Sequence, residues 1–194
     1  MYALDDLISF PLSVSGVWTL FFPKMDMRRT CEDNYGNWVE KPRSKYYDII
    51  WQGRCNGLTD DEIITEIVAG WNEIGRKASE KGTYMHRQIE LFLNGKPADE
   101  SWVEFKQFKQ WLIDEMIPNN IEPYRTEWSI YDIDRMVAGQ IDCLMKVTGT
   151  DDYRMVDWKR CGKPLDPQAN IHYDKWGMGP CSNMVDNSWS HYVV

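Results

Sequence analysis

The sequence has no apolar run that would cross a bilayer and no regular spacing of cysteines. Its 194 residues include no stretch of about 18 apolar residues, and the first ten lack the basic flank of a signal peptide. The five cysteines are scattered and form no C-x-x-C pair. Reduced thiols therefore fit better than a disulfide framework, a zinc site or an iron–sulfur cluster. We expect no membrane segment and a cytoplasmic or other reducing intracellular compartment.

An excess of basic residues is also lacking. The formal net charge is −8, with 22 Lys and Arg against 30 Asp and Glu. This balance argues against tight, non-specific duplex binding, because phosphate contacts normally come from Lys and Arg. It does not exclude a nuclease, because a metal-binding site is itself rich in carboxylates and the metal supplies positive charge at the phosphate.

Helical patterns dominate the chain up to about residue 117, and we expect residues 1–194 to form one domain. Residues 1–58 read as a helical or irregular region. Thr59 and Glu62 then form a capping-box pattern at the start of a helix that we expect to end at Lys81-Gly82. Further helices are predicted from Thr83 to Leu93 and over residues 100–117.

Strand patterns follow, which makes the expected fold α+β. Three segments rich in β-forming residues are separated by polar turns: Tyr124–Tyr131, Met136–Val147 and Tyr153–Arg160. We expect them to form a three-stranded antiparallel meander that begins a central mixed sheet covered by helices. Residues 161–188 read as a loop, and a helix begins at Trp189, so that 161–194 look like a loop and the start of a truncated helix.

Two acidic residues are predicted to face each other across the second hairpin of this meander. The two-residue strand period puts Asp157 and Lys159 on one face and Trp158 on the other. A turn centred near residue 150 makes Asp142 and Asp157 cross-strand neighbours. Like charges at that distance repel, and a divalent cation between them would explain the pairing. A surface ion pair between Asp157 and Lys159 is the simpler alternative.

The helix after Gly82 adds a histidine and a glutamate. His86 and Glu90 are four residues apart and share a helix face. An ordinary contact on a solvated face is one interpretation, and a metal site is the other. A histidine among carboxylate ligands would suit Mn²⁺ as well as Mg²⁺.

Taken together, these residues resemble the PD-(D/E)XK nuclease superfamily, most closely its RecB-type, phage and mitochondrial exonuclease branch. The resemblance covers about residues 71–160, and its motifs occur in the expected order. They are Trp71-x-x-Ile74-Gly75-x-x-Ala78-Ser79-x-x-Gly82-Thr83-x-x-His86-x-x-Ile89-Glu90, Glu127, Gly139-Gln140-Ile141-Asp142 and Asp157-Trp158-Lys159-Arg160.

The resemblance implies a restriction-endonuclease-like fold and a role for each site residue. His86, Asp142, Asp157 and the main-chain carbonyl of Trp158 would bind Mg²⁺ or Mn²⁺, and Lys159 would be the catalytic lysine. Glu90 would hold a metal-bound water or act as a further ligand. Glu127 either supports the ligands from behind or pairs with Arg125 or Arg135, and the sequence leaves both interpretations open.

The activity implied is hydrolysis of DNA phosphodiesters, most simply by an exonuclease acting on ends or single strands in replication, recombination or repair. The branch usually carries Gln-x-x-x-Tyr on a helix after the D-x-K strand, but here Gln168 and Tyr173 are five residues apart. We therefore expect a missing C-terminal segment or a partner to complete the fold. The alternative is a non-catalytic nucleic-acid-binding or assembly module. A zinc hydrolase is disfavoured because no H-E-x-x-H motif occurs.

Overall fold

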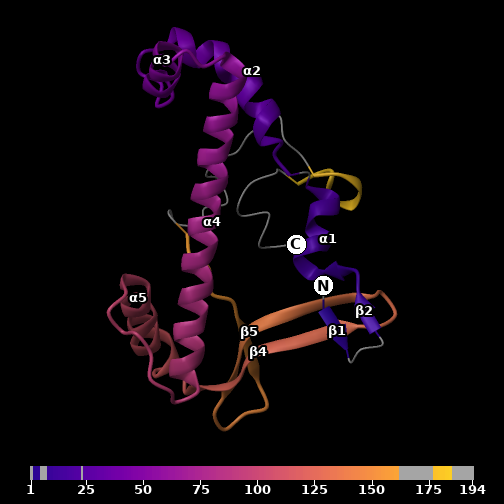
Figure 1. The fold of residues 1–194 in the computed structure, drawn as a ribbon. Coiled ribbons are helices and arrows are strands. Elements are labelled where there is room, and N and C mark those ends of the chain that lie inside the picture. The colour runs from indigo at the N-terminus through magenta and orange to yellow at the C-terminus, as the bar shows by residue number, and fades with distance from the viewer. Residues whose placement is uncertain (1, 5–7, 23, 162–176, 185–194) are drawn as a thin grey trace. The chain divides into compact units, whose positions relative to one another are not determined.

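The longest element is the 34-residue helix α4 (Asp60–Leu93), which takes part in both compact units of the chain. The computed structural model describes residues 2–4, 8–22, 24–161 and 177–184 (Figure 1). One unit is Lys24–Lys81, and the other combines Met1–Pro23 with Gly82–Val194. The division between these units falls inside α4.

The unit Lys24–Lys81 contains α2 (Met27–Glu40), α3 (Tyr47–Cys55) and the first part of α4. Residues 24–57 show no clear helical periodicity in the sequence, because α2 and α3 bury few side chains. Its core consists of side chains that are less than 9% exposed: Cys31, Tyr35, Ile50, Ile63, Ile64 and Ile67. Trp38, Tyr46 and Trp71 pack at the margin of this core, and Trp71 Nε1 donates to Tyr46 Oη over 2.9 Å.

The start of α4 confirms the predicted capping box. Glu62 Oε2 accepts from the Thr59 backbone N–H at 2.8 Å, and Thr59 Oγ1 accepts from the Glu62 N–H at 3.3 Å. The two side chains thus satisfy backbone donors that the first helical turn leaves unpaired.

The prediction of a helix end at Lys81-Gly82 is wrong, because α4 continues through this position to Leu93. Gly82 does not adopt the left-handed conformation that a helix C-cap requires. Ion pairs on the preceding turns favour continuation: Arg76 pairs with both Glu73 and Glu80, and Lys77 lies 3.3 Å from Glu73. A glycine costs about 1 kcal/mol in a helix interior, which is too little to stop a helix supported in this way.

The other unit is built on a mixed sheet of four strands in the described part of the chain. The order is β3 (Leu12–Ser13), β5 (Val137–Val147) and β4 (Ile121–Asp132), with β6 (Tyr153–Val156) also paired to β5. β4, β5 and β6 form the predicted antiparallel meander, and β3 is parallel to β5. The α+β class and the mixed sheet are thereby confirmed.

Residues near the N-terminus, for which we expected a helical or irregular region, form short strands followed by a helix. β1 (Tyr2–Leu4) pairs antiparallel with β2 (Ile8–Phe10), and α1 (Val14–Phe21) follows β3 directly. The segment is too short and too evenly apolar for its periodicity to distinguish strand from helix. The only described element after β6 is the 3-10 turn Gly179–Cys181, and the helix predicted from Trp189 lies outside the described residues.

Helices cover one face of this sheet. The end of α4 packs on α5 (Val103–Trp111), which continues into a π-helical turn over Leu112–Met116. This fulfils the prediction of a helix over residues 100–117. The shared core is apolar and strongly aromatic: Met85, Ile89, Phe105, Phe108 and Leu112. A second buried cluster, Ile121, Cys143 and Met145, lies on the sheet beside it.

Trp158 joins these two clusters. Its indole packs edge-on against Phe108 and Trp111, with ring centroids 5.3 and 5.1 Å apart. Its burial follows the predicted alternation, which directed Trp158 away from the face of Asp157 and Lys159.

In the described ranges no helix is both long and apolar enough to cross a membrane.

Replacing Gly82 with alanine tests the continuous helix. Nothing lies within 4 Å of a Cβ added at Gly82, and the residue has a helical backbone. We expect Gly82→Ala to raise the free energy of unfolding by about 0.5–1 kcal/mol. Thermal or urea denaturation followed by circular dichroism measures this change. A loss of stability would instead indicate the left-handed helix end.

The hydrogen bond between Tyr35 and Asp60 gives a pH-dependent prediction. Tyr35 Oη donates to Asp60 Oδ1 at 2.7 Å, and this bond, with Arg54, lowers the pKa of Asp60. Burial raises the pKa of Tyr35 to about 12. Because the Asp60 pKa is lowered in the folded state, the group stabilises the fold at pH values above its unfolded-state pKa, and this stabilisation is lost in acid. A raised phenol pKa gives stability that is lost as the pH rises past the ordinary value near 10.

We therefore expect Tyr35→Phe to cost about 1 kcal/mol at pH 7. The difference from the parent chain should shrink below about pH 4 and again above about pH 10. Urea unfolding at several pH values measures it. Tyr47→Phe is the matched control, and a Tyr35→Phe effect independent of pH would contradict the assignment.

Candidate metal centre

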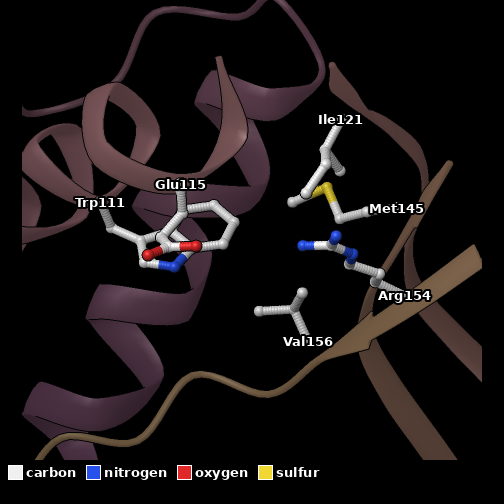
Figure 2. A pocket seen from close by; sticks show the side chains of 6 residues that line it. All are labelled: Trp111, Glu115, Ile121, Met145, Arg154 and Val156. Atoms are coloured by element: carbon white, nitrogen blue, oxygen red, sulfur yellow. The ribbon is translucent and has the colours of Figure 1, made fainter. Parts of the chain in front are cut away.

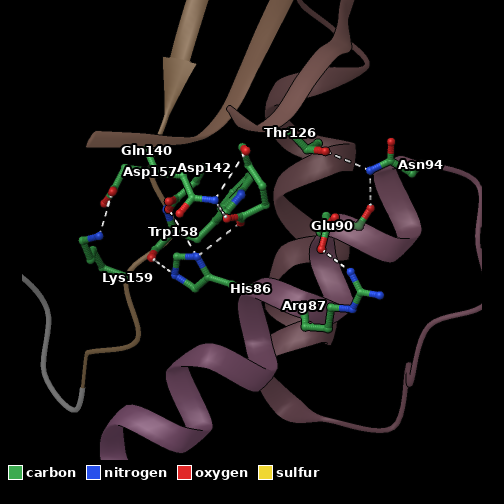
Figure 3. Close-up of polar contacts among 11 residues, drawn as sticks. His86, Arg87, Glu90, Asn94, Thr126, Gln140, Asp142, Asp157, Trp158 and Lys159 are labelled. Carbon is green, nitrogen blue, oxygen red and sulfur yellow. Dashed lines mark hydrogen bonds and ion pairs between the residues drawn. The ribbon is translucent and has the colours of Figure 1, made fainter. Parts of the chain in front are cut away.

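His86 lies on α4 with both ring nitrogens directed at oxygen atoms (Figure 3). Its Nε2 is 2.7 Å from the main-chain carbonyl oxygen of Trp158. Its Nδ1 is 3.5 Å from Asp142 Oδ2 and 3.8 Å from Glu127 Oε1. A hydrogen bond from one ring nitrogen to a carbonyl fixes the tautomer and aims the other nitrogen, as is usual for metal-binding histidines.

Glu127 and Asp142 meet because of the register between β4 and β5. Thr126 pairs with Cys143 and Trp128 with Ile141, so Glu127 falls opposite Asp142. The ligand atoms of His86, Glu127 and Asp142 all lie within 4.8 Å of one another. The structure thus brings together one imidazole and two carboxylates from three different elements.

Glu127 is held in a strained position. Its φ of 47° is in the left-handed region, which is uncommon for a residue other than glycine and costs about 1–3 kcal/mol. Gln140 Nε2 donates to Glu127 Oε2 at 2.7 Å and braces the carboxylate. Burial, followed by the negative charge of Asp142, raises the pKa of Glu127. A cation bound between the two carboxylates would relieve this repulsion.

Asp142 and His86 together hold the peptide groups of Trp158. Asp142 Oδ2 accepts from the Trp158 N–H at 2.7 Å, while the Trp158 carbonyl faces His86 Nε2. The last pair between β5 and β6 is Cys143 with Val156. After this pair, the Trp158 peptide groups contact the side chains of Asp142 and His86 and no longer the backbone of β5. The strand therefore ends at Val156, and the predicted end at Arg160 is wrong.

Asp157 is not brought into this group in the structure. Extending the β5–β6 register by one residue would put it opposite Asp142, as the sequence led us to expect. Its carboxylate instead accepts a hydrogen bond from Lys159 Nζ at 2.7 Å, and its side chain is 53% exposed. Asp157 and Lys159 thus share one side of the segment, consistent with the predicted alternation, and they form the ion pair of the simpler interpretation.

Glu90 is turned away from His86. It lies one helical turn further along α4, and its Oε2 is 2.6 Å from Arg87 Nη1 (Figure 3). Its negative charge nevertheless contributes to the raised pKa of Glu127. The structure thus places Glu90 near the centre without including it in the three-residue group.

The donor set fits a hard or borderline divalent cation. One imidazole nitrogen and two carboxylate oxygens suit Mn²⁺ and Mg²⁺, and neighbouring ligand atoms around an octahedral ion lie about 3 Å apart. The separations of 3.5 and 3.8 Å are slightly wider than this value. The Cys143 side chain follows Asp142 in the chain but lies in the apolar cluster with Ile121 and Met145, outside the group of His86, Glu127 and Asp142.

Glu127 is the residue whose role the sequence left open, either as a support for the ligands or as a partner of Arg125 or Arg135. Its pairing partner could have been found from the register of the first hairpin, because a turn between Asp132 and Val137 sets Glu127 opposite Asp142. The strained backbone could not be found in this way. The structure also does not pair Glu127 with Arg125, whose guanidinium lies 4.7 Å from the centroid of the Trp128 ring.

Comparison with known proteins identifies no relative of this chain. No family model matches the chain, and we find no similar curated protein and no similar solved structure. The case for the site therefore depends on its geometry alone.

Metal binding at this centre can be measured without any catalytic assay. At ten times its dissociation constant, Mn²⁺ should stabilise the fold by about 1.4 kcal/mol. For a chain of this size this corresponds to an increase in Tm of about 3–6 °C, which differential scanning calorimetry detects. We expect Asp142→Asn and His86→Ala to lose the increase.

The substitution Glu127→Gln tests whether Glu127 is a metal ligand or only stabilises the fold. Without metal it should raise Tm, because it removes one of two neighbouring negative charges, and with Mn²⁺ it should gain less than the parent chain. Glu122→Gln, on the same strand and exposed, is the control. An equal Mn²⁺ effect in the Glu127→Gln and parent chains would rule out Glu127 as a ligand.

Proposed function

We propose that this protein is a metal-dependent nuclease of the PD-(D/E)XK type that hydrolyses DNA phosphodiester bonds. The observation that carries the proposal is the orientation of His86. One ring nitrogen bonds the Trp158 carbonyl, and the other faces the carboxylates of Asp142 and Glu127. Trp158 stands between Asp157 and Lys159, so the same contact ties the metal ligands to the D-x-K segment.

His86, Asp142 and Glu127 would hold Mg²⁺ or Mn²⁺. When bound, such an ion polarises a phosphoryl oxygen and lowers the pKa of a water molecule. The protein's contribution is to fix the three ligands. Asp142 is bonded to the Trp158 N–H, Glu127 to Gln140, and His86 to the Trp158 carbonyl. Each ligand therefore has a hydrogen bond that limits its rotation before a substrate arrives.

Lys159 would supply the second positive charge. Its ammonium group is held by Asp157 Oδ1, and its side chain is 38% exposed. An ammonium at this position can orient the attacking water and stabilise negative charge on the pentacoordinate phosphate. Arg160 Nε bonds Glu104 Oε1 at 2.7 Å and anchors the segment that follows Lys159 to the start of α5.

DNA ends or single strands are the proposed substrate, and an exonuclease is the proposed activity. The net charge of −8 supports a substrate held by few phosphate contacts rather than an extended duplex.

A non-catalytic nucleic-acid-binding module is the second candidate. The contact between Asp157 and Lys159 favours it, because the carboxylate is engaged by the lysine instead of lying with the other ligands. In that case the contacts of His86 and Asp142 with Trp158 would only stabilise the fold.

Degradation of end-labelled DNA tests the nuclease. We expect single-stranded DNA to be cleaved with Mn²⁺ or Mg²⁺ and not with EDTA. Lys159→Ala should lower the rate by about 10²–10³-fold, the usual cost of losing one group that stabilises transition-state charge. Lys96→Ala, a lysine on an exposed turn after α4, is the matched control and should keep the parent rate.

The outcomes separate the two candidates. Cleavage that needs no metal, or full activity in Lys159→Ala, would refute the mechanism. DNA binding in a filter assay without any cleavage, together with a normal Mn²⁺ effect on Tm, would identify the binding module.

A further inference from the structure

A pocket of about 350 Å³ lies between the covered face of the sheet and the helix α5 with its π-helical end (Figure 2). Its lining residues come from these two sides: Trp111 and Glu115 from the helix, and Ile121, Met145, Arg154 and Val156 from the strands. Such a volume is within the range of small-molecule sites. Val156 directly precedes Asp157, yet none of the proposed metal ligands lines this pocket.

Two opposite charges stand at the pocket without contacting each other. Figure 2 shows the Arg154 guanidinium directed from the strand into the space that separates it from Glu115 and Trp111. Among the described residues, neither Arg154 nor Glu115 forms a side-chain hydrogen bond or an ion pair. A donor group and an acceptor group therefore line one cavity, and neither has a side-chain partner within the described part of the chain.

The remaining wall is apolar and partly aromatic. Ile121 and Met145 are buried, at 6% and 0% exposure, and the half-buried Trp111 indole forms one side. A ligand that fits must present a flat or apolar body to this wall. It must also offer an acceptor to the guanidinium and a donor to the carboxylate on the same molecule.

The geometry points to a guanine base as the ligand of this pocket. Guanine accepts hydrogen bonds at O6 and N7, the groups that a guanidinium recognises with two bonds. It donates from N1 and from its 2-amino group, which a carboxylate accepts, and its ring can pack on an indole. Adenine keeps the N7 acceptor but presents an amino donor in place of O6 and a ring acceptor at N1, so the second bond from Arg154 and the bonds to Glu115 would be lost.

This inference does not depend on the nuclease activity. The base belongs either to a free guanine nucleotide or to a guanine in a nucleic-acid strand, and both offer the same edges. Calorimetric titration of the full chain in EDTA, where the metal centre is not loaded, measures binding directly. The probes are GMP, AMP, the trinucleotides TGT and TAT, and leucine, whose charged groups would also match Arg154 and Glu115.

We expect GMP to bind with a dissociation constant below about 1 mM and AMP at least about tenfold more weakly. Glu115→Gln and Arg154→Ala should each weaken GMP binding by about tenfold or more, the effect of one lost charged hydrogen bond. Both side chains are exposed, so the fold should persist, and circular dichroism checks this. Glu122→Gln and Arg43→Ala are matched exposed controls and should bind GMP as the parent does.

The trinucleotides distinguish the two sources of the base. Tighter binding of TGT than of GMP, with TAT weak, supports a guanine within a strand, whereas tighter binding of GMP supports a free nucleotide. Equal affinity for GMP and AMP, absence of saturable GMP binding, or unchanged GMP binding in both pocket variants would overturn the proposal. Binding of leucine in place of GMP would overturn it as well and identify a zwitterion site.

Discussion

The centre depends on two hydrogen bonds to the peptide groups of Trp158. Asp142 accepts from its N–H, and His86 contacts its carbonyl oxygen, so two side chains from separate elements hold one residue of the segment after β6. The indole of the same residue is fixed between Phe108 and Trp111. Backbone and side chain together give this segment a defined position, from which Asp157 and Lys159 project to the opposite side.

The second constraint is electrostatic. Glu127 and Asp142 are opposite each other in the β4–β5 hairpin, and burial together with this neighbouring charge raises the pKa of Glu127. The strained backbone of Glu127 and its hydrogen bond from Gln140 show that the sheet keeps the carboxylate there at a cost. A cation bound between the two carboxylates would offset this repulsion.

The sequence predicted much of this fold because its strongest local signals agree with the tertiary contacts. The Thr59–Glu62 capping box and the antiparallel meander are found in the segments that the sequence predicted, although the third strand ends at Val156 and not at Arg160. It failed at Gly82, where a glycine after a lysine looks like a helix end. The local cost of glycine is only about 1 kcal/mol, and ion pairs on the preceding turns outweigh it.

The sequence by itself determined which residues could form the centre: the spacing from His86 to Lys159, the alternation around Trp158 and the register that faces Asp142 toward the D-x-K segment. Only the tertiary structure decided which of them meet. It joined Glu127 to His86 and Asp142, left Asp157 with Lys159, and turned Glu90 toward Arg87. The reason is physical: spacing fixes the face on which a side chain lies, but its partner depends on packing and charge from elements distant in the chain.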